Sequence, residues 1–474
     1  MDRQLAGGRK QRRSGPRSKK GFLTCRGRHT RCDEARPVCG NCRKARLQCQ
    51  QPDFVSSKWS AFAPDSVDQC SVRSPARAKA QDPQSHARNE AEQSSRTASD
   101  PRPTSPAESV ITPEIAHLLR TYESDIATWM DVFDSQLTYQ RRLLCMAPSS
   151  PLLLNAICAL AAQQLSLIRS ANIWKPVAEH YYGLAVHLLA RLLSAYPSKM
   201  ELAIVGTILL SSYELLASTG VDYQRHFKGA HTIVESIHAQ NSTIPLIRAS
   251  FWNYARHEVA QALNRNSPTL HDPRSWPKVN LAEAEPTSED AFCNDVLRLA
   301  AETVCIAFRE TAAESSRTKR RKRELLALRS ELDTWLRLCP KEWRGIEYEG
   351  DGNARYWFPR PNFAAALVFY HLSMLLSCLE LEKLSSGAQS GDENENENDK
   401  DNQDQVDAHS RQIIFIALSS LPDSAMVVVV QPLCYAVKYV SDTKLRDQAI
   451  LLLDDVERRT GFHTRRKLER QLAR

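Results

Sequence analysis

Residues 22–49 read FLTCRGRHTRCDEARPVCGNCRKARLQC, a short strip that combines five cysteines with many basic side chains. The cysteines are Cys25, Cys32, Cys39, Cys42 and Cys49, so that six, six, two and six residues separate successive members. A six-residue gap returns the chain to the same side after a turn of helix, which lets both halves of the strip bring cysteines to one centre. The pattern therefore predicts a metal-organised module that binds nucleic acid, with a disulfide framework as the alternative.

Basic residues are concentrated at the start of the chain. Residues 1–50 hold 15 Lys/Arg against three acidic residues, a net charge of +12; the whole chain carries +8, so residues 51–474 sum to −4. Because each phosphate that is neutralised releases counterions, this asymmetry favours a polyanionic partner for the first 50 residues. We expect residues 1–20 to form a basic disordered arm. Its run RKQRRSGPRSKK at 9–20 indicates a nuclear-import sequence or a contact with the DNA backbone, or else a solvated charge run.

The composition changes twice after the cysteine-rich strip. Residues 51–110 are rich in Ser, Pro, Gln, Ala and Arg and hold too few large apolar residues to bury a core, so we expect a disordered linker. No apolar heptad occurs there, and the sequence therefore does not predict a symmetric dimer. From Thr112 and Pro113, a cap followed by a first-turn proline, apolar residues recur at intervals of three and four. Residues 111–474 thus predict one large all-α domain.

The apolar periodicity also gives approximate helix positions in this domain. After the starts at Thr112 and Ser150-Pro151, helices are expected near 176–195, 199–217, 222–239, 246–264, 288–316, 324–338, 362–382, 408–420, 425–440 and 443–459. We expect 363–379 to be a buried core helix rather than a membrane span, because His371, Ser373 and Ser377 interrupt it. The run KRRKR at 319–323 indicates a second import signal, an anion site or a solvated loop-to-helix junction, and 391–405 indicates an exposed acidic loop.

The remaining cysteines lack the spacing of metal ligands and are expected to be buried, reduced thiols. They are Cys70, Cys145, Cys158, Cys293, Cys305, Cys339, Cys378 and Cys434. Motifs of common enzyme classes are missing as well. His257-Glu258 begins like a zinc-protease motif, but Gln261 stands where the second histidine is needed, and Gly350 and Gly352 are only a fragment of a glycine fingerprint. We therefore do not expect an enzyme.

The cysteine spacing resembles the fungal zinc binuclear cluster, in which six cysteines hold two zinc ions through two bridging thiolates. The family pattern is C-x2-C-x6-C, a loop containing proline, then C-x2-C-x6-C. The five cysteines match its last five positions and Pro37 matches the loop proline, whereas Phe22 occupies the position of the first cysteine, a bridging ligand. The resemblance implies that Zn²⁺ is held by Cys25, Cys32, Cys39, Cys42 and Cys49. Each metal would lack one sulfur, which leaves a position for water or His29, and whether one or two zinc ions bind stays open.

The same resemblance implies a DNA-reading segment. In the family, the residues after the second cysteine enter the major groove and read a CGG-type triplet. By position this segment runs from Arg26 to Arg31, with Arg28 and His29 nearest the bases, and Arg28 can donate bidentately to guanine. Contacts with phosphate are implied for Arg31, Arg43, Lys44 and Arg46.

Stretches of the helical region resemble the fungus-specific transcription factor domain that accompanies these clusters. They include YELLASTGVDYQRHFKGAHTIVES, beginning at residue 213, and VVVVQPLCYAVKYVSDTKLRDQAILLLDDVERRTGF, beginning at residue 427, and they follow the family's order from about 112 to 470. The two resemblances imply a nuclear protein that binds double-stranded DNA and regulates RNA polymerase II genes. They also imply transcription machinery or co-regulators as partners, a possible small-molecule effector and no membrane, with the oligomeric state open. The alternative is a transcription-associated interaction protein whose degenerate cluster no longer binds DNA specifically.

Overall fold

The chain divides into two units, Met1–Ala98 and Ser99–Arg474. The computed structural model describes residues 24, 28, 30, 33, 39–45 and 47 of the first, and 110–195, 199–217, 224–238, 242–278, 289–309, 315–350, 353–386 and 394–473 of the second. The predicted arm at 1–20 and all but the last residue of the predicted linker at 51–110 lie outside the described residues. Within the first unit, the described part contains the helix α2 (Gly40–Lys44).

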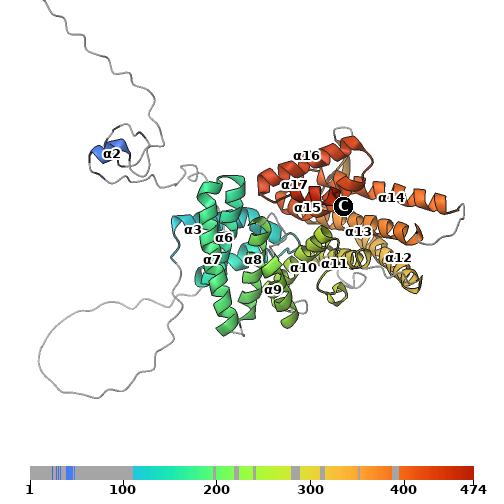
Figure 1. Ribbon diagram of the computed structural model, residues 1–474, viewed down its shortest axis with the longest axis horizontal. Coiled ribbons are helices and arrows are strands. Elements are labelled where there is room, and N and C mark those ends of the chain that lie inside the picture. The colour runs from blue at the N-terminus through green and yellow to red at the C-terminus, as the bar shows by residue number, and fades with distance from the viewer. Residues whose placement is uncertain are drawn as a thin grey trace, which may run out of the picture. The chain divides into compact units, whose positions relative to one another are not determined.

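The second unit is built from helices, as the sequence predicts (Figure 1). Its first half contains α3 (Pro113–Thr121), η1 (Tyr122–Ile126), α4 (Ala127–Met130), η2 (Thr138–Leu143), α5 (Leu144–Met146), η3 (Ala147–Ser149), α6 (Pro151–Ile168), α7 (Ala171–Ala195), α8 (Met200–Ala217), α9 (Gln224–Ser236) and α10 (Pro245–Arg265). Its second half contains η5 (Pro273–Ser275), α11 (Glu289–Ala307), α12 (Ser315–Leu338), η6 (Lys341–Trp343), the strands β1 (Ile346–Gly350) and β2 (Asn353–Trp357), α13 (Pro361–Ser386), α14 (Asn394–Ala417), α15 (Asp423–Tyr439), α16 (Thr443–Thr460) and α17 (Arg465–Leu472).

The helix-start signals act locally as expected. Thr112 is extended, and its Oγ1 accepts a hydrogen bond from the Ile115 amide at 3.2 Å, so that it caps α3 in front of Pro113. Pro151 likewise occupies the first position of α6. Both starts therefore follow from residues that satisfy or remove amide donors, which a first helical turn leaves without partners.

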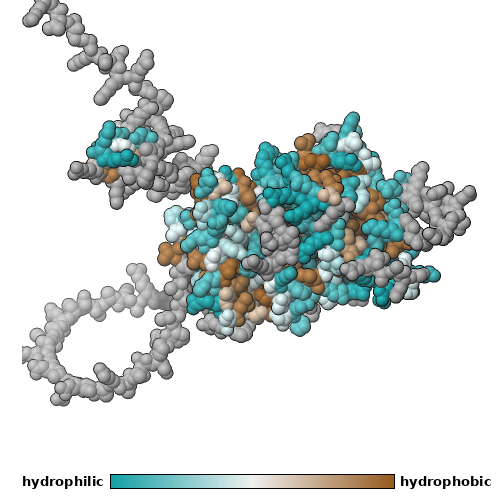
Figure 2. Space-filling model, viewed as in Figure 1, coloured by the Kyte–Doolittle hydropathy of each residue, from teal (hydrophilic) through white to brown (hydrophobic). Residues whose placement is uncertain are grey.

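Two groups of helices form the hydrophobic core. In one, α6 packs against α7 and α8, and α8 against α9; in the other, α13 packs against α11, α14 and α15. Helix α10 contacts α8, α11 and α15, and it lies between the two groups in Figure 1. On the face shown in Figure 2, hydrophilic residues cover much of this unit and separate its hydrophobic patches.

Three helices are long and apolar enough to cross a membrane by length and composition: Pro151–Ile168, Met200–Ala217 and Pro361–Leu384. However, 78%, 67% and 83% of these stretches are buried by other parts of the protein. The third includes 363–379, where Phe363, Leu372 and Leu375 are fully buried. The prediction of a buried core helix at 363–379 is therefore confirmed.

A β-hairpin interrupts the helices, and the sequence analysis did not predict it. β1 and β2 pair antiparallel, with Ile346 opposite Trp357. Contacts with α14 and the residues after it hold the hairpin: the Tyr356 amide donates to Ser419 Oγ at 2.8 Å, and the Tyr356 hydroxyl donates to Gln412 Oε1 at 3.0 Å. Strands this short depend on such tertiary partners, which local sequence patterns do not reveal.

The acidic stretch at 391–405 is not a loop, contrary to our expectation. From Asn394 onward it belongs to α14, since Glu and Gln are good helix formers and the following turns pack on the core. Two polar side chains anchor it: Asn402 Nδ2 donates to the Cys378 carbonyl at 2.9 Å, and Gln405 Oε1 accepts from Arg329 at 2.9 Å. The predicted helix at 408–420 is thus the second half of a longer one.

The predicted helix at 288–316 is also divided differently. Helix α11 ends at Ala307 and α12 begins at Ser315, so the run KRRKR lies inside a helix rather than at a loop-to-helix junction. Its middle residue, Arg321, is buried and donates to Glu380 Oε1 at 2.8 Å and to the Ala307 carbonyl at 3.0 Å. This arginine therefore joins α12 to α13, whereas the other four residues of the run are exposed.

Helix α10 carries a buried glutamate that holds the next loop in place. Glu258 is only 1% exposed, and its Oε1 accepts a hydrogen bond from the His271 amide at 2.6 Å. No described residue is a hydrogen-bond partner of its Oε2. Burial raises the pKa of Glu258 to about 7, although the hydrogen bond from His271 opposes this change.

We expect Glu258→Gln to reduce the pH dependence of stability. A folded-state pKa of about 7, above the ordinary value of 4.5, stabilises the fold below pH 4.5, and this contribution is lost as the pH rises through 7. Between pH 5 and 7.5 the free energy of unfolding should therefore fall by roughly 2 kcal/mol more in the natural chain than in the variant. Urea unfolding at both pH values measures this difference, with Glu469→Gln at an exposed position as control. Equal pH dependence of stability in all three chains would show that Glu258 does not have a raised pKa in the folded state.

We also expect a fragment of residues 111–474 to fold without zinc or DNA. Its core consists of buried apolar side chains from α3 to α17, and it contains none of the cysteines at 25–49. Far-ultraviolet circular dichroism should show the same helical signal with and without a chelator. A fragment of residues 15–60 serves as the opposite control, because its signal should change. If the chelator removed the helical signal of the 111–474 fragment, the folding of the helical domain itself would depend on metal, which would contradict the prediction.

Candidate metal centre and nucleic-acid interface

The C-x2-C turn at Cys39 and Cys42 brings two sulfur atoms to the start of α2. Cys39 is the N-cap, with extended backbone angles of φ −66° and ψ 152°, and its Sγ accepts a hydrogen bond from the Cys42 amide at 3.3 Å. Both side chains are fully buried. An amide donor to sulfur favours the thiolate, which is the form that binds metal, and such turns are typical of zinc sites.

Asp33 fixes the entry into this turn, a role that the sequence analysis missed. The Gly40 amide donates to its carboxylate, at 2.9 Å to Oδ2 and 3.1 Å to Oδ1. A Cβ atom at position 40 would lie 2.4 Å from Asp33 Oδ2, so a larger residue there would displace the Asp33 carboxylate from this position. The signal that could have revealed Asp33 is its place directly after Cys32 in a strip with few acidic residues.

The described basic side chains of this unit are exposed. Arg43 and Lys44 lie in the last turn of α2, directly after the buried Cys42, and Arg28 lies in a turn. Positive side chains at a helix C-terminus also compensate the helix dipole. The arrangement therefore places positive charge on the surface beside the buried sulfurs.

Several residues of the predicted site lie outside the described residues. They are Phe22, Cys25, Arg26, His29, Arg31, Cys32, Arg46 and Cys49. Three of the five predicted ligands are among them, and the described residues alone contain no group of three or more His, Cys, Asp or Glu that could hold a metal ion. What the structure brings together is Cys39 and Cys42, and this pair of soft, buried donors fits zinc.

The other described cysteines are not arranged as ligands. Burial raises the pKa of Cys158 and of Cys434 to about 12, which keeps both as neutral thiols. Cys293, Cys339 and Cys378 are also buried. The expectation of burial is wrong for Cys145, which is exposed, and Cys305 is only half-buried. Cys70 lies outside the described residues.

The partial zinc-protease motif on α10 does not form a metal site either. The Glu258 carboxylate binds the backbone of His271, as described above, and burial lowers the pKa of His257 to about 3. Both residues are therefore explained by packing and by the anchoring of a loop.

Comparisons with known proteins match both units. The description "fungal Zn(2)-Cys(6) binuclear cluster domain" fits residues 23–58, beginning directly after Phe22, and the description "fungal specific transcription factor domain" fits residues 117–470. No solved structure matches the chain.

Curated relatives agree with these family matches. A protein named transcription activator AMTR1, from Alternaria alternata, is 23% identical over 491 residues, which cover 77% of this chain. This chain spans 64% of that relative's length. Two shorter matches are an uncharacterized transcriptional regulatory protein of Schizosaccharomyces pombe and adhesion and hyphal regulator 1 of Candida albicans. The first is 48% identical over 40 residues, 8% of this chain and 7% of the relative, and the second is 38% identical over 50 residues, 10% and 8%.

The second family match covers most of the chain and coincides with the helices from α3 to α17. The first coincides with the cysteine-rich strip that contains the C-x2-C turn. The chain therefore belongs to the family of proteins that carry the fungal specific transcription factor domain, here together with a fungal Zn(2)-Cys(6) binuclear cluster domain.

Proposed function

We propose that this chain is a nuclear, sequence-specific DNA-binding transcription factor that regulates RNA polymerase II genes. The observation that carries the proposal is the C-x2-C turn, in which exposed Arg43 and Lys44 directly follow two buried sulfurs within the matched cluster domain. The net charge of +12 on residues 1–50 supports a polyanionic partner for the same unit. The names of the relatives, a transcription activator and regulators, favour the same role.

The metal ligands in this proposal are Cys25, Cys32, Cys39, Cys42 and Cys49. When bound, zinc supplies cross-links that stabilise a module too small for a large apolar core. The chain's own contribution is visible at the C-x2-C turn, where the Cys42 amide donates to Cys39 Sγ and the Gly40 amide donates to the Asp33 carboxylate. These five sulfurs would hold one or two zinc ions.

DNA recognition is assigned by position along this strip. Residues Arg26 to Arg31 enter the major groove and read a CGG-type triplet, with Arg28 and His29 at the base edges. Arg31, Arg43, Lys44 and Arg46 contact phosphate groups. The helical domain modulates the activity through a small-molecule effector or a protein partner such as a co-regulator, and it has no catalytic role.

A second candidate function rests on Phe22. A phenyl ring cannot replace the bridging thiolate of the family pattern, so each zinc ion loses one ligand at once. If the cluster no longer holds its metals, the chain is instead a transcription-associated interaction protein that acts through its helical domain. The two candidates differ in whether residues 21–50 bind a specific duplex.

We expect Arg28→Ala and Arg43→Ala to weaken DNA binding in different ways. Loss of a bidentate contact with guanine should cost Arg28→Ala about 1–3 kcal/mol on a CGG-containing duplex but little on a random one. Loss of a phosphate contact should weaken the binding of Arg43→Ala about equally on both duplexes. It should also reduce the slope of log affinity against log salt concentration by about one. Fluorescence anisotropy at several salt concentrations measures both effects. Equal losses on both duplexes for both variants would refute the assignment of roles.

We expect Phe22→Cys to raise the zinc content of a residue 15–60 fragment toward two ions and to tighten its binding to DNA. One substitution restores the bridging sulfur to both metals. Native mass spectrometry gives the zinc content and anisotropy gives the affinity. Phe22→Ser is the matched control, because it removes the ring without adding a metal ligand.

Unchanged zinc content with unchanged affinity in Phe22→Cys would count against a limiting role for the missing thiolate. If the natural fragment then binds a specific duplex, other ligands such as His29 complete its metal sites. If it binds no specific duplex, the second candidate function is the correct one.

A further inference from the structure

The helical domain contains a partly enclosed cavity of about 100 Å³. Residues of α4, α6, α8, α9, α10, α13, α15 and α17 line it. It therefore lies where the two groups of helices in Figure 1 meet. Trp129, Phe227, Phe369 and Phe462 line much of it, and no aspartate or glutamate belongs to its walls.

One wall of the cavity carries a buried donor without a partner. Gln431 of α15 is only 5% exposed, and its Nε2 finds no hydrogen-bond partner among the described residues. A buried amide in this state loses its hydrogen bonds with water and gains none in exchange. A hydrogen-bond acceptor in the cavity would satisfy this donor.

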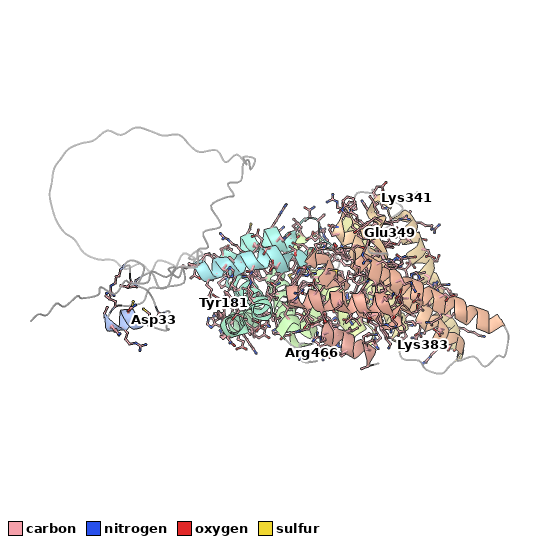
Figure 3. All side chains as sticks on the ribbon, turned by 90° about the horizontal axis from the view of Figure 1, so that it is seen from above. Asp33, Tyr181, Lys341, Glu349, Lys383 and Arg466 are labelled. Atoms are coloured by element: carbon pink, nitrogen blue, oxygen red, sulfur yellow. The ribbon has the colours of Figure 1, made fainter. Side chains whose placement is uncertain are left out.

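A second wall carries a cation, and no carboxylate belongs to the cavity walls beside it. Lys467 belongs to α17, next to Arg466, which Figure 3 labels. Its Nζ lies 3.5 Å from the centre of the Phe462 ring. The negative side chain that raises its pKa is Glu457, which accepts hydrogen bonds from the Thr464 and Arg465 amides and does not line the cavity. Burial lowers the pKa of Lys467 to about 7, a sign that water solvates this ammonium poorly.

The remaining polar groups in the walls do not supply a negative charge. The Arg256 guanidinium is itself a buried cation, which donates to the Met130 carbonyl and to Asn253 Oδ1, both at 2.6 Å. His257 is neutral, since burial lowers its pKa to about 3. An anionic group in the cavity would thus meet only positive or neutral neighbours in its walls, and the surrounding apolar side chains would strengthen that attraction.

We propose that this cavity binds a small, mainly apolar carboxylic acid. Its carboxylate pairs with the Lys467 ammonium and accepts a hydrogen bond from Gln431 Nε2, while its apolar part packs against the aromatic side chains. At about 100 Å³ the cavity is smaller than the cavity of about 150 Å³ that holds one benzene molecule, but it is only partly enclosed, so it would take the carboxylate and part of a single ring or of a short branched chain. The inference rests on the proposed function, in which it identifies the site and the chemical class of the effector.

The test uses the full chain without DNA and two probes of equal shape, benzoate and benzamide. Calorimetric titration should show that benzoate binds about tenfold tighter or more, because only benzoate forms a charge-assisted hydrogen bond with Lys467. Lys467→Met should remove this preference, whereas Lys444→Met, the same change at an exposed position, should keep it. Gln431→Leu should weaken both probes, since each offers a carbonyl oxygen. Ala260→Phe, which fills the cavity, should abolish binding of both.

Three results would overturn the proposal: no binding of benzoate, equal affinity for the two probes, or benzoate binding that Ala260→Phe leaves unchanged. Circular dichroism of each variant shows whether it is folded. If Lys467→Met does not fold, the proposal is still tested by two measurements: the preference of the natural chain for benzoate over benzamide, and the loss of binding in Ala260→Phe. Failure of DNA binding is measured separately on the duplexes described above, so it would refute the proposed function without altering these titrations.

Discussion

The burial of three nearly apolar helices determines the architecture of the large unit. Helix α6 is buried along almost its entire length, from Leu152 to Ser166, and α8 and α13 are similar. Such helices have no polar side to expose, so other helices must surround them. Each large side chain removed from water contributes about 1.5–3 kcal/mol, and many such residues on three helices outweigh any single polar interaction. The amphipathic helices pack around these three, which gives two groups of helices with α10 between them.

Polar groups on the enclosed helices have to find partners inside the protein. On α10, Glu258 binds the amide of His271, and Arg256 binds the carbonyl of Met130. Between α12 and α13, Arg321 and Glu380 form an ion pair in which both side chains are less than a tenth exposed. These contacts join segments that are distant in sequence. Because a buried polar group without its partner is costly, the helices have to align so that each pair can form.

Much of the fold could be predicted from the sequence because helical periodicity and Thr-Pro or Ser-Pro starts act locally. The predictions are wrong where contacts between distant residues determine the local structure. The hairpin was not predicted, and Tyr356 holds it through Ser419. The start of α14 was predicted as a loop, and Asn402 anchors it by binding the carbonyl of Cys378. The candidate metal centre shows the same division. The C-x2-C turn is a local pattern and could be recognised, whereas the place of Asp33 after Cys32 is a sequence signal that does not by itself identify Gly40, seven positions further on, as its partner.

The cavity follows from the same constraint that builds the core. Protein interiors close empty space when their walls can move, but these walls belong to two groups of helices, one packed around α6 and α8 and the other around α13. Lys467 also resists closure, because further burial would remove the water that its half-buried side chain still contacts. A ligand with one acceptor group offers a partner to both Gln431 and Lys467 while it fills the space between the groups. Since it binds only where both groups are in place, its concentration is linked by mass action to the stability of the whole domain.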